Sequence, residues 1–161
     1  MQLIRQARSM PIRVYADTSV FGGVFDPGID KASQEFFEQV NQGRFELVTS
    51  NVVADELAAA PERVRRQFEI FLPMSELIIP SAQALALQRA YLQANIVTPK
   101  WATDALHVAI ASVNHCKIIV SWNFKHIVHF DKIPLYNGVN LINGYDTLSI
   151  NTPAEVITYE D

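Results

Sequence analysis

The chain has 161 residues and a net charge of −4, with 49% hydrophobic and 19% charged residues. These values fit one globular domain, residues 1–161, which is long enough to bury a core of its own. The acidic balance argues against a large nucleic-acid footprint, since such surfaces are usually basic. The single cysteine, Cys116, excludes an internal disulfide and a cysteine-rich zinc site.

The N-terminal segment 1–11 carries two arginines and no apolar run of signal-peptide length. No stretch of the sequence approaches the roughly 20 apolar residues that cross a bilayer. We therefore expect a cytoplasmic protein that does not enter a membrane, with residues 1–11 as a flexible arm.

Short apolar runs alternate with helical patterns along the chain. Strands are predicted at 13–17, 45–49, 76–79, 117–121 and, as a short fifth strand, 139–142. Helices are predicted over 31–42 with Asp30 as cap and Gly43 as stop, from Ser50 or Asn51 to 61, over 62–71, over 82–95 with Ser81 as cap, and from Thr98 onward. A capping box, Thr152 to Glu155, predicts a small terminal helix. This alternation is typical of a parallel sheet of four or five strands flanked by helices.

Polar residues follow the predicted strands, at the sheet edge where α/β proteins bind ligands. Asp17 ends the first strand, and Asn123 follows the fourth. Glu56 lies in the helix after the second strand, and Asp104 lies in the helix before the fourth. Parallel crossovers can bring these four residues to one edge.

Carboxylates that converge repel one another unless a cation neutralises them. Mg²⁺ takes oxygen ligands, usually one or two carboxylates with waters and substrate phosphate. An ion of this kind activates water and offsets charge on a phosphate. The pattern therefore indicates hydrolysis of a phosphodiester by metal-activated water, although an isolated Asp at a strand end is more often a cap or turn residue.

Four segments of the chain resemble the PIN-domain family, and in particular VapC-like toxin ribonucleases. They are Tyr15-Ala-Asp-Thr-Ser19, Glu56-Leu57, Asp104-Ala-Leu-His-Val-Ala109 and Val120-Ser-Trp-Asn-Phe-Lys-His126, in the order in which the family has them. The resemblance implies a three-layer PIN-like α/β domain and a Mg²⁺- or Mn²⁺-dependent endoribonuclease, a hydrolase acting on RNA. It also implies the toxin of a toxin–antitoxin pair, with a cognate antitoxin as partner and a homodimer as assembly.

Carried over residue by residue, the metal ligands would be Asp17, Glu56 and Asp104, with Asn123 as a fourth catalytic residue. Many members of the family carry Asp at this fourth position. Asn removes one negative charge, which puts a second metal ion in doubt. A slip of one residue would choose Asp55 in place of Glu56, because neighbours on a helix point about 100° apart.

Substrate contacts are expected from Ser19, Lys100, Lys125 and His126, each with a structural alternative. Ser19 would equally serve as a helix cap. His107 shares a helix face with Asp104 and is interpreted as a buried histidine that holds a carboxylate or backbone group rather than as a catalytic base. The indoles of Trp101 and Trp122 are able to stack on bases or to pack in the core. The run Arg63 to Arg66 is a solvated helix face or a phosphate contact.

Three other functions compete with the ribonuclease. A non-catalytic PIN-like module that binds RNA or a protein would explain Asn123 and the acidic charge, but the three retained acids argue against it. A phosphatase of the haloacid dehalogenase type requires Asp-x-Asp after the first strand, where this chain has Asp17-Thr-Ser19. A dinucleotide-binding enzyme requires a Gly-x-Gly-x-x-Gly turn, which the chain lacks. Apolar helices around Phe36-Phe37 and residues 68–72 would form either an antitoxin groove or core.

Overall fold

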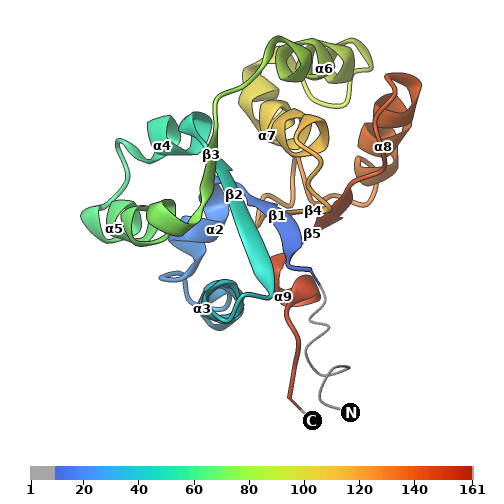
Figure 1. Ribbon diagram of the computed structural model, residues 1–161. Coiled ribbons are helices and arrows are strands. Elements are labelled where there is room, and N and C mark those ends of the chain that lie inside the picture. The colour runs from blue at the N-terminus through green and yellow to red at the C-terminus, as the bar shows by residue number, and fades with distance from the viewer. Residues whose placement is uncertain (1–9, 161) are drawn as a thin grey trace, which may run out of the picture.

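The computed structural model describes residues 10–160. Within this range the centre of the molecule is a parallel five-stranded sheet with the strand order β3-β2-β1-β4-β5 (Figure 1). The strands are β1 (Ile12–Ala16), β2 (Phe45–Ser50), β3 (Glu76–Ile78), β4 (Ile118–Val120) and β5 (Ser149–Asn151). The expected α/β architecture, a parallel sheet between helical layers, is confirmed. The first nine residues of the predicted N-terminal arm lie outside the described range.

The two central strands form the most deeply buried part of the sheet. Val14, Tyr15 and Ala16 of β1 and Ile119 and Val120 of β4 have no exposed surface. Continuous apolar strands of this kind are characteristic of parallel sheets that are covered on both faces. The polar residues that follow these strands are therefore held by a rigid, dry scaffold.

Four helices cover one face of the sheet, on the left and lower side of Figure 1. They are α2 (Thr18–Gly23), α3 (Asp30–Asn41), α4 (Asn51–Leu57) and α5 (Glu62–Phe71), with the 3₁₀ turn η1 (Leu72–Met74) after α5. Aromatic rings join them: Phe21 lies 5.3 Å from Phe37 and 5.2 Å from Phe68, and Phe37 lies 4.5 Å from Phe71, between ring centroids. These phenylalanines are buried, so they belong to the core and do not line a groove.

The other face is covered by α6 (Ala82–Gln93), α7 (Ala102–Val113) and α8 (Ile133–Ile142), in the upper right of Figure 1. The short helix α9 (Pro153–Val156) follows β5 and packs against α3. Tyr91 of α6 and Tyr136 of α8 meet edge to face with ring centroids 4.9 Å apart. Tyr91 also donates a hydrogen bond to the buried Asn140. In residues 10–160 no helix has both the length and the apolar character needed to span a membrane.

The predicted strand at 139–142 is wrong. These residues form the last turn of α8, and the fifth strand is β5, which pairs with β4. An apolar run of four residues does not distinguish a strand from a helix. Pro134, in the first turn of α8, is a helix-start signal, because its missing N–H would have no helical partner there.

Two helix starts also differ from the prediction. Asp30 lies inside the first turn of α3, whose N-cap position is Ile29. The helix expected from Thr98 begins as a 3₁₀ turn, η2 (Pro99–Trp101), before α7, and the Thr98 side chain makes no capping bond. The other predicted caps are confirmed: Ser50 caps α4, Ser81 caps α6, and Thr152 and Glu155 form the capping box of α9.

Candidate active site

The strand order reverses direction between β1 and β4, and Asp17 lies at this point. In open α/β sheets a crevice forms outside the carboxyl ends of the strands where the order reverses. Asp17 follows β1, and its N–H donates to the carbonyl of Val120 in β4 at 3.2 Å. Ser121 follows β4 directly, so the two strands deliver Asp17 and Ser121 to the same place.

Asp17 is 4% exposed, and both of its carboxylate oxygens accept hydrogen bonds. Ser19 donates to Oδ1 from its hydroxyl at 2.6 Å and from its N–H at 3.1 Å, and the Ser121 hydroxyl donates to Oδ2 at 2.6 Å. Burial raises the pKa of Asp17, the charge of His107 and the two hydroxyls lower it, and the charge of Glu56 raises it, with a net increase. A buried carboxylate beside a second carboxylate is an electrostatic arrangement that a cation would relieve.

Ser19, an expected substrate contact, is engaged by the protein itself. Its hydroxyl donates to Asp17 and accepts the N–H of Trp122 at 2.8 Å. Asp17, and not Thr18 or Ser19, occupies the N-cap position of α2. Ser19 therefore ties the start of α2 to the residues after β4.

Glu56 projects from α4 toward the first turn of α2. Its Oε1 accepts from the hydroxyl of Thr18 at 2.8 Å and from Nε2 of His107 at 2.5 Å. Burial pushes the pKa of Glu56 upward, but the hydrogen bond and charge of His107 and the hydrogen bond of Thr18 outweigh it, so the pKa lies below its ordinary value. Glu56 is thus held as a carboxylate by Thr18 and His107, although both it and its neighbour Asp55 are exposed.

A buried chain of hydrogen bonds supports Glu56 from behind. Nδ1 of His107 lies 2.7 Å from the hydroxyl of Tyr15, which lies 2.7 Å from the hydroxyl of Ser50. Since an ionised carboxylate only accepts, Nε2 of His107 carries the proton toward Glu56, and in the neutral ring Nδ1 accepts from Tyr15. Burial raises the pKa of Tyr15, which keeps its proton available for this bond.

Sequence reasoning placed His107 as a carboxylate-holding histidine but missed Tyr15, Ser50 and Ser121 as parts of the site. One signal pointed to Tyr15. A tyrosine in a wholly apolar strand must find a partner for its hydroxyl, and Tyr15 shares a strand face with Asp17 two residues later. Nothing comparable marked Ser50, which also caps α4 through Val53 N–H at 3.4 Å.

Asp104 lies in the first turn of α7 and is partly buried. Within residues 10–160 its carboxylate has no hydrogen-bond or ion-pair partner. Its charge acts on His126, where it opposes the lowering of the pKa by burial, so the two side chains lie near each other. Asp104 therefore belongs to the side of the site that α7 and the segment after β4 form.

Asn123 stabilises the turn after β4. Its Oδ1 accepts the N–H of His126 at 2.9 Å, and its own N–H donates to the Ser121 hydroxyl at 2.9 Å. The side-chain oxygen that was expected to face a metal is thus bonded to backbone. A carbonyl oxygen has a second lone pair, so one further interaction is still open to it.

Among residues 10–160, no three His, Cys, Asp or Glu side chains are grouped so as to hold a metal ion. The residues nonetheless fit a Mg²⁺ or Mn²⁺ ion at Asp17 and Glu56. Two carboxylates with waters are the usual protein contribution to a Mg²⁺ site, and Asp17 is a buried carboxylate whose charge only hydroxyls, one N–H and the nearby histidine offset. Asp104 is not joined to this pair by a shared contact.

His126 stacks on Trp101 at the edge of the site, with ring centroids 4.5 Å apart and an interplanar angle of 27°. Lys100 and Lys125 lie with their Nζ atoms 5.1 and 5.7 Å from the centroid of the same indole. Three of the expected substrate residues therefore meet at Trp101. Trp122 is a structural residue instead, since its Nε1 donates to Ser33 at 2.8 Å.

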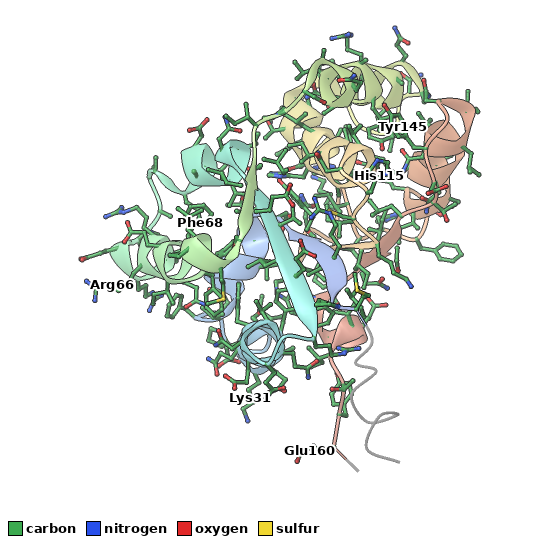
Figure 2. All side chains as sticks on the ribbon, in the orientation of Figure 1. Lys31, Arg66, Phe68, His115, Tyr145 and Glu160 are labelled. Atoms are coloured by element: carbon green, nitrogen blue, oxygen red, sulfur yellow. The ribbon has the colours of Figure 1, made fainter. Side chains whose placement is uncertain are left out.

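The arginines of α5 are held away from this group. Arg63 lies over the ring of Phe25 at 5.1 Å, Arg65 donates to the carbonyl of Ala60, and Arg66 pairs with Glu62 at 3.1 Å. In Figure 2, Arg66 lies at the outer end of α5, on the opposite side of the molecule from α7. The interpretation of this run as a solvated helix face agrees with these contacts.

No family model and no curated protein matches the sequence. Solved structures that match the fold include VapBC2 from Rickettsia felis bound to a DNA fragment from their promoter, and FitAcB from Neisseria gonorrhoeae. The first has a TM-score of 0.58 at 19% identity and covers 87% of this chain and 98% of the other. The second has a TM-score of 0.53 at 10% identity, with 87% and 97% covered.

Both neighbours have the PIN/VapC-like fold. Likeness at these identities shows a common fold and not a common activity. The chain therefore has a PIN-like, VapC-like fold, and the resemblance inferred from its sequence motifs is confirmed at the level of the fold.

Proposed function

We propose that this protein is a metal-dependent endoribonuclease that hydrolyses RNA phosphodiester bonds and acts as the toxin of a toxin–antitoxin pair. The observation that carries the proposal is the pair of carboxylates where the strand order reverses. Asp17 is buried with both oxygens held, and Glu56 is kept ionised by His107 and Thr18. Burying a carboxylate is costly unless it is paired, and Asp17 has hydrogen bonds but no cationic side chain of residues 10–160 bonded to it, so a bound cation would lower this cost.

In this proposal Asp17 and Glu56 would hold one Mg²⁺ or Mn²⁺ ion, with Asp104 in the first turn of α7 as the third proposed ligand. When bound, the ion would lower the pKa of a water molecule and offset charge on the phosphate. Ser19 and Ser121 fix the orientation of Asp17, and His107 fixes that of Glu56.

The remaining residues act on the substrate side. Asn123 shapes the turn that carries Lys125 and His126, and Lys100 is delivered by η2. Lysine side chains next to a carboxylate site attract the phosphate backbone that the carboxylates alone would repel.

The proposed partner is an antitoxin protein. Both structural neighbours are toxin–antitoxin complexes, and each is matched over 87% of this chain. The homodimer remains a prediction from the resemblance, and the cytoplasmic location remains a prediction from the sequence.

A non-catalytic module with the same fold is the second candidate. It is favoured by the engagement of the Asn123 oxygen with backbone and by the lack of a three-residue metal group in the described part of the chain. Such a module would bind RNA or protein without hydrolysis. Metal-stimulated cleavage separates the two candidates.

The test compares Asp17→Asn with Asp55→Asn, an exposed carboxylate one residue from Glu56. Purified protein is incubated with a labelled single-stranded RNA and Mn²⁺ or Mg²⁺, with EDTA as the metal-free control. We expect Asp17→Asn to lower the cleavage rate by more than about a hundredfold, because even residues outside the ligand sphere account for 10- to 100-fold in metal affinity or activity. Asp55→Asn should cleave like the wild type. Undiminished cleavage by folded Asp17→Asn would reject the assignment.

A further inference from the structure

Trp101 is the centre of an unusual surface group beside the candidate site. The indole is 36% exposed, and the ammonium groups of Lys100 and Lys125 lie 5.1 and 5.7 Å from its centroid. We call Trp101, Lys100 and Lys125 the indole–lysine platform. Two lysines from segments 25 residues apart in sequence thus converge on one exposed aromatic ring.

His126 supports the platform from one side. Its ring stacks on Trp101 at 4.5 Å, and it is 8% exposed. Both ring nitrogens are buried, and neither has a hydrogen-bond partner in the described part of the chain. A histidine without polar partners contributes packing alone here, so its role in this structure is to hold the indole. His126 therefore covers one face of Trp101, and a base would stack on the indole where the two flexible lysine side chains now lie over it.

The platform adjoins the candidate site on two segments. Lys100 and Trp101 immediately precede α7, whose first turn contains Asp104. Lys125 belongs to the turn that Asn123 stabilises. Trp101 lies three residues before Asp104 at the start of α7 and stacks on His126, so the platform lies at the end of α7 that carries Asp104.

We propose that the indole–lysine platform binds one unpaired nucleotide of a single-stranded nucleic acid, with its base on Trp101 and its flanking phosphates on Lys100 and Lys125. This deepens the proposed ribonuclease function and rests on it for the choice of RNA as the strand. A base needs a flat, exposed π-face, and each phosphate needs a cation within reach of the base. The lysine stems are flexible, so their ammonium groups move aside to the phosphates when a base stacks.

The two positive charges of the platform disfavour a cationic partner and favour an anionic one. Lys100 and Lys125 give the platform a local positive charge, although the protein as a whole has a net charge of −4. A duplex fits poorly, because its bases are already stacked on one another and present no free face. An acidic peptide would satisfy the lysines but would leave the indole face without a use, and it becomes an outcome of the test.

Binding is measured in Asp17→Asn, so that the strand is not cleaved, by fluorescence anisotropy of a labelled eight-nucleotide RNA without metal. Stacking of a base on an aromatic ring is expected to account for a five- to hundredfold loss of affinity in Trp101→Ala, with about half the effect on a logarithmic scale in Trp101→Phe. Lys100→Ala and Lys125→Ala should each reduce the slope of log affinity against log salt by about 0.7.

Matched controls are Tyr159→Ala, which removes another exposed aromatic ring, and Lys31→Ala on α3. Lys31 lies at the opposite end of the molecule from α7 (Figure 2), and both variants should bind RNA like the parent. Thermal unfolding of each variant checks that it is folded. Abasic substitutions along the RNA give a second measure that needs no folded variant. One position should lose affinity on removal of its base in the parent, lose about half as much on a logarithmic scale in Trp101→Phe, and lose none in Trp101→Ala.

The outcomes separate this proposal from the ribonuclease. Trp101-dependent binding without any metal-stimulated cleavage by the wild type supports the platform and rejects the enzyme. Cleavage with no loss of binding in Trp101→Ala and no sensitive abasic position rejects the platform and leaves the enzyme intact. Binding that is equal for single strand and duplex, or that only an acidic peptide shows, also overturns the platform.

Discussion

The two sides of the candidate site are built in opposite ways. On the side of Asp17 and Glu56, both oxygens of Asp17 and one of Glu56 accept hydrogen bonds, and the residues Ser50, Tyr15 and His107 that lead to Glu56 are buried. On the side of Asp104 and His126, polar atoms within residues 10–160 have few or no partners, and exposed aromatic and lysine side chains dominate. Both sides hold a buried histidine next to a carboxylate.

This difference corresponds to two different requirements at one edge of the sheet, a fixed geometry for an ion and an open surface for a flexible strand. Fully satisfied polar networks rigidify, because each unpaired group in a buried network is expensive. A site that must hold an ion in fixed geometry needs such a network. A surface that must accept and release a flexible strand needs open groups instead. We infer that the first side is stabilised by its own hydrogen bonds and that the second awaits a ligand.

The largest expected effect comes from His107→Phe. The change removes the bonds from both ring nitrogens and leaves the hydroxyl of Tyr15 and the carboxylate of Glu56 without this partner. Loss of a bond to a charged group together with an unpaired buried hydroxyl should lower the free energy of unfolding by about 3 kcal/mol. Urea unfolding measures it, and a loss below about 1 kcal/mol would show that the network is not stabilising.

Gly23→Ala should have the second-largest effect on stability, for a steric reason. A Cβ at position 23 would lie 2.7 Å from the Ser33 hydroxyl and 2.8 Å from Nε1 of Trp122, which are bonded to each other. Overpacking of this kind costs about 2 kcal/mol. Because Trp122 N–H also holds Ser19 against Asp17, cleavage should fall together with stability. Thermal unfolding and the RNA assay test both effects, with Gly138→Ala, where the added Cβ meets nothing within 4 Å, as the control for a glycine change.

In metal-free protein, the contributions of Glu56 and Asp17 to folding stability should depend on pH with opposite signs. The pKa of Glu56 is lowered by folding, so its stabilisation is present above its ordinary pKa and is lost as the pH falls through the folded value. The pKa of Asp17 is raised by folding, so the contribution of Asp17 to stability is most favourable at low pH. It declines as the pH rises from the ordinary pKa to the raised pKa of the folded state.

Variants make this contrast measurable in EDTA at pH 7. Asp17→Asn should gain about 1 kcal/mol of stability, a common result when a strained functional residue is replaced. Glu56→Gln should lose about 1 kcal/mol, a figure reduced by its partial exposure. The gap between the two variants should close toward pH 3. Two variants that lose stability alike would contradict the electrostatic account.

The smallest effect is expected for His126→Phe, the matched counterpart of His107→Phe. Neither nitrogen of His126 has a partner in the described residues, and a phenyl ring preserves the stack on Trp101. Stability should change by less than about 0.5 kcal/mol, because no hydrogen bond is lost. A loss of unfolding free energy as large as that of His107→Phe would show that both histidines stabilise the fold equally, and it would contradict the difference drawn between the two sides of the site.

The sequence predicted most of this fold because four strands are apolar runs that end in polar residues. β5 was missed because Ser149–Asn151 is a three-residue edge strand without an apolar run. Residues 139–142 were predicted as a strand because their sequence is mostly apolar, although they are the last turn of α8. Asp17 and Glu56 were recognised from motifs. Apart from the bonds of Ser19 to Asp17, two positions apart, the bonds that orient them join residues 35 to 104 positions apart and depend on side-chain geometry that no local pattern encodes. The metal and substrate roles of these residues stay predictions.

Calorimetric titration of Mn²⁺ or Mg²⁺ tests the central claim most directly, since it needs no knowledge of the RNA. Wild-type protein and Asp55→Asn should bind one ion, and Asp17→Asn should show no binding in the same concentration range. Equal binding by Asp17→Asn and wild type, or no binding by folded wild type, would contradict the claim that this pair of carboxylates holds a metal ion.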